Sequence, residues 1–277
     1  MTKLPRVLSR SRRVSGVLIF TTLLAAGMSQ AGTTPPVPDA QKLNDLLSRT
    51  AGQTSGFLDQ FSDVKCTEQV RQEKLNKDNK VELKEDSTYD YLVILTNSGG
   101  ELNLSESRIP VHEAKRDRRN TSMLLSNGFA TLFLVFHPLY AESFKFSLAG
   151  EETLDGHLLE KVTFQHIPGM RSPAALALRG REYPLELGGT AWIDPQTGSI
   201  AKIEAGIADT LADVGLKSLD SEIDFAPLPF PDEKQVYWYP TQARVEVETP
   251  KQHWRNLHHF TAYKKFEVST EEQVIKK

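Results

Sequence analysis

Residues 189–207 read GTAWIDPQTGSIAKIEAGI, and this stretch decides the fold. From Ala201 to Ile207, apolar residues alternate with Lys202 and Glu204, which is the period of a strand with one buried face. The preceding residues Asp194–Gly198 contain a proline and a glycine, and the glycine can adopt the positive φ that a tight turn requires. The stretch therefore predicts two antiparallel strands joined by a hairpin.

The same alternation recurs on both sides of this hairpin. It is typical of antiparallel sheet with one face covered and the other in water. We therefore expect an α+β fold that is mainly antiparallel β, with about ten or eleven strands. The further alternating stretches are 64–70, 89–95, 144–148, 158–164, 243–248 and 260–268.

A helical pattern precedes the first strand. Between Asp39 and about Phe61, mainly apolar residues recur at spacings of three and four, which defines one face of an amphipathic helix. Asp39 stands where an N-cap belongs, whereas Gly52 and Gly56 each cost about 1 kcal/mol relative to alanine. We expect this helix to pack its stripe onto the sheet. The stripe consists of Leu43, Leu46, Leu47, Thr50, Thr54, Phe57, Leu58 and Phe61.

Two segments break the alternation. Residues 123–140 are strongly apolar, end at His137-Pro138, and predict a buried helix. A buried strand remains the alternative for the second half of this segment, because periodicity does not separate the two. Residues 172–187 mix alanines with prolines and Gly180, and they predict a long surface loop or flap.

The N-terminal 31 residues indicate where the chain works. Five basic residues precede an apolar run from Val17 to Met28, and small residues follow at 29 and 31. This order predicts a secretory signal peptide removed after about Ala31, since a membrane-spanning helix needs about 20 apolar residues. We then expect a proline-rich spacer at 32–38, one domain at 39–270 and a charged tail at 271–277. The expected location is the periplasm, with no integral membrane segment after processing.

The net charge and the single cysteine indicate which partners and which cysteine chemistry to expect. Removal of the leader leaves 28 basic and 36 acidic residues, a net charge of about −8, which argues against a nucleic-acid partner. The single cysteine, Cys66, lies on the apolar face of an alternating stretch, so we expect a buried and inert thiol. A mature chain of this length can bury a sizeable core without disulfides.

The polar residues contain none of the common sequence signatures of catalysis. No two of the seven histidines have the His-Glu-x-x-His spacing, and neither Gly-x-Ser-x-Gly nor a glycine-rich phosphate loop occurs. The sequence therefore predicts a non-enzymatic protein with no catalytic residue, metal site or cofactor. A hydrolase without a recognised signature remains a third alternative.

The order of elements resembles the LolA/LolB/RseB-like superfamily of periplasmic lipoprotein carriers and related sensors. The likeness spans about residues 39–270 and includes large uncharacterised secreted families of this type. Its local motifs are a strand with an aromatic residue and an Asp-x-x-Thr-Gly turn, at Trp192–Gly198, and a late strand at Tyr263–Val268. The resemblance implies an open half-barrel closed by helices, with the apolar segment at 123–136 as a lid or plug.

The resemblance also implies a binding site inside the half-barrel. The apolar segment would supply its wall or lid through Leu125, Phe129, Leu132, Phe133 and Phe136, and the alternative is that these residues complete a dry core. Independently of the resemblance, Trp238 and Trp254 are candidates for a cavity mouth, with rim packing as the alternative, because aromatic side chains with polar tips favour such boundaries. Arg116, Arg118 and Arg119 would contact a lipid head group or a carboxylate of a partner.

Two hypotheses about function follow. In the first, the protein is a periplasmic carrier that shelters a lipid, an acyl chain or a lipidated protein in an apolar concavity. In the second, it is an envelope scaffold or sensor domain that binds a protein partner and encloses no ligand. A concavity that is filled by the protein's own side chains favours the second hypothesis.

Overall fold

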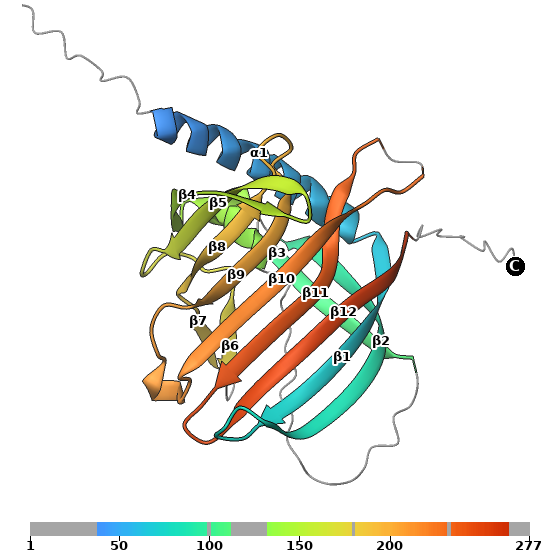
Figure 1. Ribbon diagram of the computed structural model, residues 1–277, viewed down its shortest axis with the longest axis vertical. Coiled ribbons are helices and arrows are strands. Elements are labelled where there is room, and N and C mark those ends of the chain that lie inside the picture. Colours follow the sequence, from blue (N-terminus) through green and yellow to red (C-terminus); the bar gives the residue numbers. More distant parts are fainter. Residues whose placement is uncertain (1–37, 99–100, 112–131, 179–180, 232–233, 266–277) are drawn as a thin grey trace, which may run out of the picture. The chain divides into compact units, whose positions relative to one another are not determined.

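The computed structural model describes residues 38–98, 101–111, 132–178, 181–231 and 234–265. The chain divides into two units, Met1–Pro36 and Val37–Lys277, and all described residues belong to the second. Within them, an antiparallel sheet is accompanied by a long helix, α1 (Pro38–Phe61), and by three short helical segments (Figure 1). The short segments are η1 (Phe133–Phe136), α3 (Pro138–Ala141) and η2 (Ala212–Val214).

The main sheet has ten strands, each antiparallel to its neighbours. The first and last strands of the spatial order do not pair with each other, so the sheet is an open half-barrel, and the predicted α+β class is confirmed. In spatial order the strands are β3 (Glu101–Pro110), β2 (Val81–Ser98), β1 (Val64–Leu75), β12 (His253–Lys265), β11 (Tyr237–Glu248), β10 (Ser218–Leu228), β9 (Ile200–Ile207), β8 (Leu187–Ile193), β5 (His157–His166) and β4 (Phe144–Leu154).

The predicted loop at 172–187 is wrong for most of its length. Strand β6 (Ala175–Leu178) pairs with β7 (Arg181–Pro184) in a separate two-stranded sheet. The prolines did not prevent pairing because Pro173 lies before β6 and Pro184 is the last residue of β7.

The sheet has an apolar inner face and a polar outer face. On β11, Tyr239, Ala243 and Val247 are buried on the inner face, whereas Arg244 and Glu246 project from the outer face. Helix α1 covers the inner face, crosses the strands near one end of the sheet, and contacts β4, β11, β1 and β2 (Figure 1). The predicted amphipathic helix is thus confirmed, although it begins at Pro38 and Asp39 lies inside its first turn.

Polar contacts and close packing hold α1 in place. At its N-terminal end Lys42 pairs with the buried Glu160 of β5 and, at 3.2 Å, with Glu151 of β4. In its middle, the turn before β9 touches the helix so closely that a Cβ at Gly198 would lie 2.6 Å from the carbonyl carbon of Arg49. The Asp194–Gly198 turn of the hairpin that decides the fold therefore also positions α1.

The apolar segment ends as the sequence predicts but is not one helix. Residues 133–136 form a 3-10 turn, and α3 starts again at Pro138 after an extended His137 with φ −70° and ψ 140°. The residue before a proline avoids the helical region, which explains the break. The strand alternative is wrong for residues 133–136, and residues 123–131 lie outside the described part of the chain.

The contact at Gly198 can be tested by substitution. Gly198 has φ +78°, so an alanine at this position strains the backbone, and its Cβ also pushes against α1. We therefore expect Gly198→Ala to lower the free energy of unfolding by about 2–4 kcal/mol. Gly215→Ala is the matched control, because its φ is +76° and no atom lies within 4 Å of the added Cβ. Urea denaturation measures both. Equal losses in the two variants would contradict the proposed helix–turn contact.

Candidate functional site

The inner face around η1 is the candidate binding site. Leu132, Phe133, Leu134, Val135 and Phe136 are all at most 5% exposed. Every side chain of this run is therefore buried against the sheet or α1. We call residues 132–136 the plug.

Aromatic contacts fix the plug on both sides. The ring of Phe133 meets Phe57 of α1 edge-on, with centroids 5.0 Å apart. Phe136 packs on Phe146 at 5.3 Å and on Phe164 at 5.9 Å, both on the sheet. Leu132, Phe133 and Phe136 thus lie together in the core, and their role as the wall of a binding site stays a prediction.

A small cavity of about 30 Å³ lies beside the plug, enough for roughly one water molecule. Phe133 reaches it from the plug, and Thr54 and Phe57 reach it from α1. Tyr237 and Trp238 at the start of β11 complete one side of its wall. The described residues beside the plug thus line a cavity that is far too small for an acyl chain.

The two tryptophans that the sequence assigns to a cavity mouth lie apart. Trp238 lines the small cavity and packs on His157, with ring centroids 5.6 Å apart. Trp254 pairs with Val247 at the other end of β11, so the structure does not bring it to the same mouth. The indole nitrogen of Trp254 is buried, and no hydrogen-bond partner for it is found in the described structure.

Five further predicted residues cannot be placed. Leu125 and Phe129 of the predicted lid, and the cationic residues Arg116, Arg118 and Arg119, lie outside the described residues. Their contribution to a binding site remains a prediction.

A buried charged cluster, which sequence reasoning missed, occupies the inner face of β1, β3 and β12. Glu68 is fully buried and accepts hydrogen bonds from Arg108 at 2.5 and 2.9 Å and from His258 Nδ1 at 2.8 Å. Arg108 also pairs with Glu106 at 2.9 Å and lies over the ring of Tyr91, 4.9 Å from its centroid. The sequence did contain a signal, because Glu68 has the same parity as the buried Val64, Cys66 and Val70.

Charge pairing sets the ionisation of this cluster. Burial raises the pKa of the Glu68 carboxyl, but hydrogen bonds from His258 and Arg108 outweigh this effect and hold that pKa below its usual value. Burial alone would lower the pKa of the Arg108 guanidinium, whereas its bond to Glu68 and the charge of Glu106 raise it. Glu68 and Arg108 are therefore both charged at neutral pH.

The cluster also protects a free sheet edge. Glu106 and Arg108 belong to β3, which is an edge strand of the ten-stranded sheet. Inward-pointing charges make an edge strand a poor template for pairing with another chain. Here Glu68 and His258 on neighbouring strands compensate the inward charges and so tie the edge strand to the sheet.

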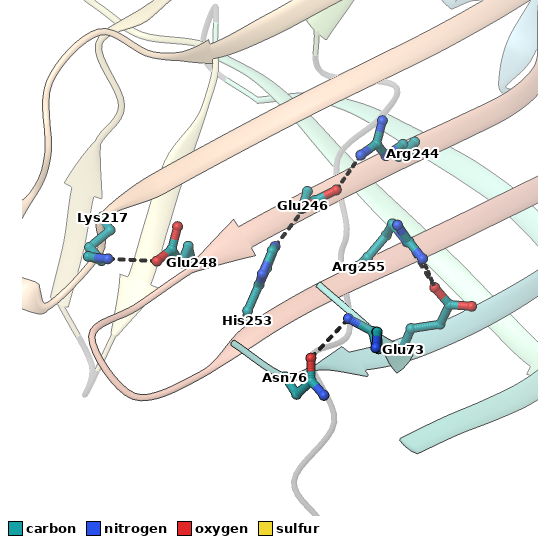
Figure 2. A network of polar contacts seen from close by, with 9 residues as sticks. Glu73, Asn76, Lys217, Arg244, Glu246, Glu248, His253 and Arg255 are labelled. Atoms are coloured by element: carbon teal, nitrogen blue, oxygen red, sulfur yellow. Dashed lines mark hydrogen bonds and ion pairs between the residues drawn. The ribbon is translucent and has the colours of Figure 1, made fainter. Parts of the chain in front are cut away.

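The outer face of β11, β12 and β1 carries charged side chains, which range from the exposed Arg244 to the buried Glu73. Figure 2 shows contacts between charged side chains on β11, β12 and β1, and one with Lys217, just before β10. A shallow trough of about 600 Å³ crosses this face, and its charged lining is unsuited to an apolar ligand. The ion pairs drawn in Figure 2 are Arg244–Glu246, His253–Glu246, Arg255–Glu73 and Lys217–Glu248, with N···O distances of 2.5–2.6 Å.

Neither the free cysteine nor a cluster of potential metal ligands forms a reactive centre in the described residues. Burial raises the pKa of the Cys66 thiol to about 12, so the expected buried and unreactive cysteine is confirmed. No three His, Cys, Asp or Glu side chains of the described ranges converge to hold a metal ion. In the same ranges, no helix combines the length and the apolar character needed to cross a membrane.

Comparison with known proteins gives likeness of fold only. No family model and no curated protein matches the chain. It is similar to a DUF1329 family protein from Desulfovibrio piger, with 13% identity and a TM-score of 0.44 over 86% of this chain and 97% of that one. An outer membrane lipoprotein-sorting domain from Vibrio parahaemolyticus is 12% identical, with a TM-score of 0.40 over 83% and 95%. A structure of MucB in complex with MucA matches with 8% identity and a TM-score of 0.18, over 83% of this chain and 100% of that one.

The buried cluster generates a pH-dependence prediction. Because the pKa of Glu68 is lower in the folded protein, its charge stabilises the fold above the unfolded value of about 4.3, and this contribution is lost as pH falls through the folded pKa. Glu68→Gln should cost about 3–5 kcal/mol at pH 7. Below about pH 4.3, its unfolding free energy should fall less steeply than that of the wild type.

Urea denaturation between pH 7 and pH 3 measures both effects. Glu248→Gln is the control, because Glu248 pairs with Lys217 on the surface, where pairing contributes little. If Glu68→Gln and the wild type lost stability in parallel below pH 4.3, Glu68 would not be the buried acidic group that we describe.

Proposed function

We propose that the mature chain is a non-enzymatic periplasmic carrier for a lipid, an acyl chain or a lipidated protein. In this proposal the plug occupies the place of the ligand when none is bound. One observation carries it: five consecutive apolar residues are buried on the inner face but belong to no strand of the sheet.

The backbone of the plug is suited to displacement. A 3-10 helix of four residues contains few hydrogen bonds, and their geometry is poorer than in an α-helix. No side chain caps its N-terminal end at Leu132, and at its C-terminal end the amide of His137 bonds only within the turn, to Leu134. The position of the plug therefore depends on its side-chain contacts, which a ligand of similar chemistry can replace.

The energies of the two occupants are similar. Burying five large apolar side chains stabilises by roughly 8–15 kcal/mol, at about 1.5–3 kcal/mol each. A chain of about 15 methylenes gains roughly 12 kcal/mol on burial, at about 0.8 kcal/mol per methylene. Exchange of plug for acyl chain is therefore close to balanced, which a carrier that both loads and releases its cargo requires.

The second candidate is a scaffold or sensor domain that binds a protein partner and encloses nothing. The filled inner face favours this alternative, because the cavity of about 30 Å³ has no room for a ligand unless the plug moves. The two candidates differ in one respect that can be measured, namely whether the protein ever holds an acyl chain.

Variants of the plug and of the sheet separate the candidates. Phe133→Ala weakens the plug, so we expect the dissociation constant for a fluorescent 16-carbon fatty acid to fall at least tenfold. Phe144→Ala is the control, because it removes a buried ring of β4 whose ring contacts are with Phe146, Phe164 and His166 of the sheet. Each substitution should lower the free energy of unfolding by about 3–5 kcal/mol, but Phe144→Ala should not tighten binding.

Extraction of lipid provides the second readout. Mass spectrometry under denaturing conditions, applied to protein purified from its own envelope, should recover an acyl species. If no acyl species were recovered and neither the wild type nor Phe133→Ala bound the fatty acid, the carrier proposal would be overturned in favour of the scaffold.

A further inference from the structure

We propose that the small cavity between α1 and the start of β11 is the port through which an aliphatic chain enters, tail first. The inference rests on the proposed function and adds the route and the part of the ligand that leads. Its starting point is that Phe133 belongs both to the plug and to the wall of this cavity. Displacement of Phe133 would therefore connect the cavity with the inner face.

The volume and the lining residues of the cavity indicate which part of a ligand can enter it. The cavity, with a volume of about 30 Å³, has room for roughly one water molecule or the end of an aliphatic chain, and it is too small for a ring or a head group. Phe57, Phe133, Ile200 and Phe225 give it an apolar wall, and each is at most 8% exposed. Gln53, on the other hand, is only half-buried, so the cavity has a polar side as well as an apolar interior.

Helix α1 approaches β11 closely at Gly56, beside Tyr237 of the cavity wall. A Cβ at Gly56 would lie 2.5 Å from the hydroxyl oxygen of Tyr237, so only glycine allows α1 and β11 to approach with Tyr237 in the cavity wall. A glycine inside a helix costs about 1 kcal/mol relative to alanine. At position 56, this cost accompanies the close approach of α1 to β11.

The side chains on either side of the cavity join α1 to the segment before β11 through one weak polar contact, although α1 packs closely on Tyr237 nearby. Lys42 and Gln60 hold the ends of the helix to β5 and β12. Across the cavity, Gln235 Nε2 donates to Gln53 Oε1 at 3.2 Å in an exposed hydrogen bond between neutral groups. Such a bond contributes about 1 kcal/mol at most, so thermal motion can break it and widen the port.

A cross-link across the port tests the route. Gln53→Cys/Gln235→Cys bridged with a short bis-maleimide should slow the uptake of a fluorescent 16-carbon fatty acid at least tenfold in stopped-flow measurements. Gln60→Cys/Lys265→Cys is the matched control, because it ties the same helix to the sheet away from the cavity at a contact of 3.3 Å. The buried Cys66, with its raised pKa, should not react with the reagent.

The outcomes separate the port from the carrier function. Slow uptake in the bridged port variant alone, with normal rates in the control and in unbridged protein, supports the port. Equal rates in both bridged variants overturn the port and leave the carrier function standing. Absence of uptake by the wild type and by both unbridged variants overturns the carrier function, and the port with it.

Discussion

An open sheet with one apolar face must have that face covered, and this constraint governs the rest of the structure. The ten strands do not close on themselves, so the inner side chains of β8 to β12 and β1 cannot fill the interior by facing one another. Helix α1 and the plug supply the missing surface. Phe57 of the helix contacts both Phe133 of the plug and Tyr239 of β11, with ring centroids 5.0 and 5.2 Å apart. The sheet, α1 and the plug therefore form the core together.

The two covering elements are held by different forces. Helix α1 has its own hydrogen-bond ladder, an ion pair at Lys42 and close packing at Gly56 and Gly198, so its position is fixed at several points. The plug has a single 3-10 turn and apolar contacts. This difference is the physical reason to assign exchange to the plug and only a small opening motion to the middle of α1. The charged cluster around Glu68, meanwhile, holds the edge strand β3 so that the sheet itself stays intact.

Elements with a strong local pattern were predictable from the sequence. The stripe from Leu43 to Phe61 and the Asp194–Gly198 turn each carry their signal within a few residues, and both are confirmed. The hairpin β6–β7 was missed because two strands of four residues are too short for periodicity to show. The cluster of Glu68, Arg108 and His258 joins positions 40 and 190 residues apart, and such pairing depends on strand order, which one sequence does not reveal. The plug was predicted as a group of apolar residues, but whether they line or fill a hollow depends on packing.

Hydrogen exchange at residues 133–137 tests the central claim, exchange of plug for ligand, most directly. The amide of His137 bonds to Leu134 within the turn, and the side chains around it are buried, so these amides should be protected in the ligand-free protein. When the protein is saturated with a 16-carbon fatty acid, protection should fall at residues 133–137 and stay constant in β8 and β9. Unchanged or increased protection of the plug in a protein that demonstrably holds the fatty acid would contradict the claim.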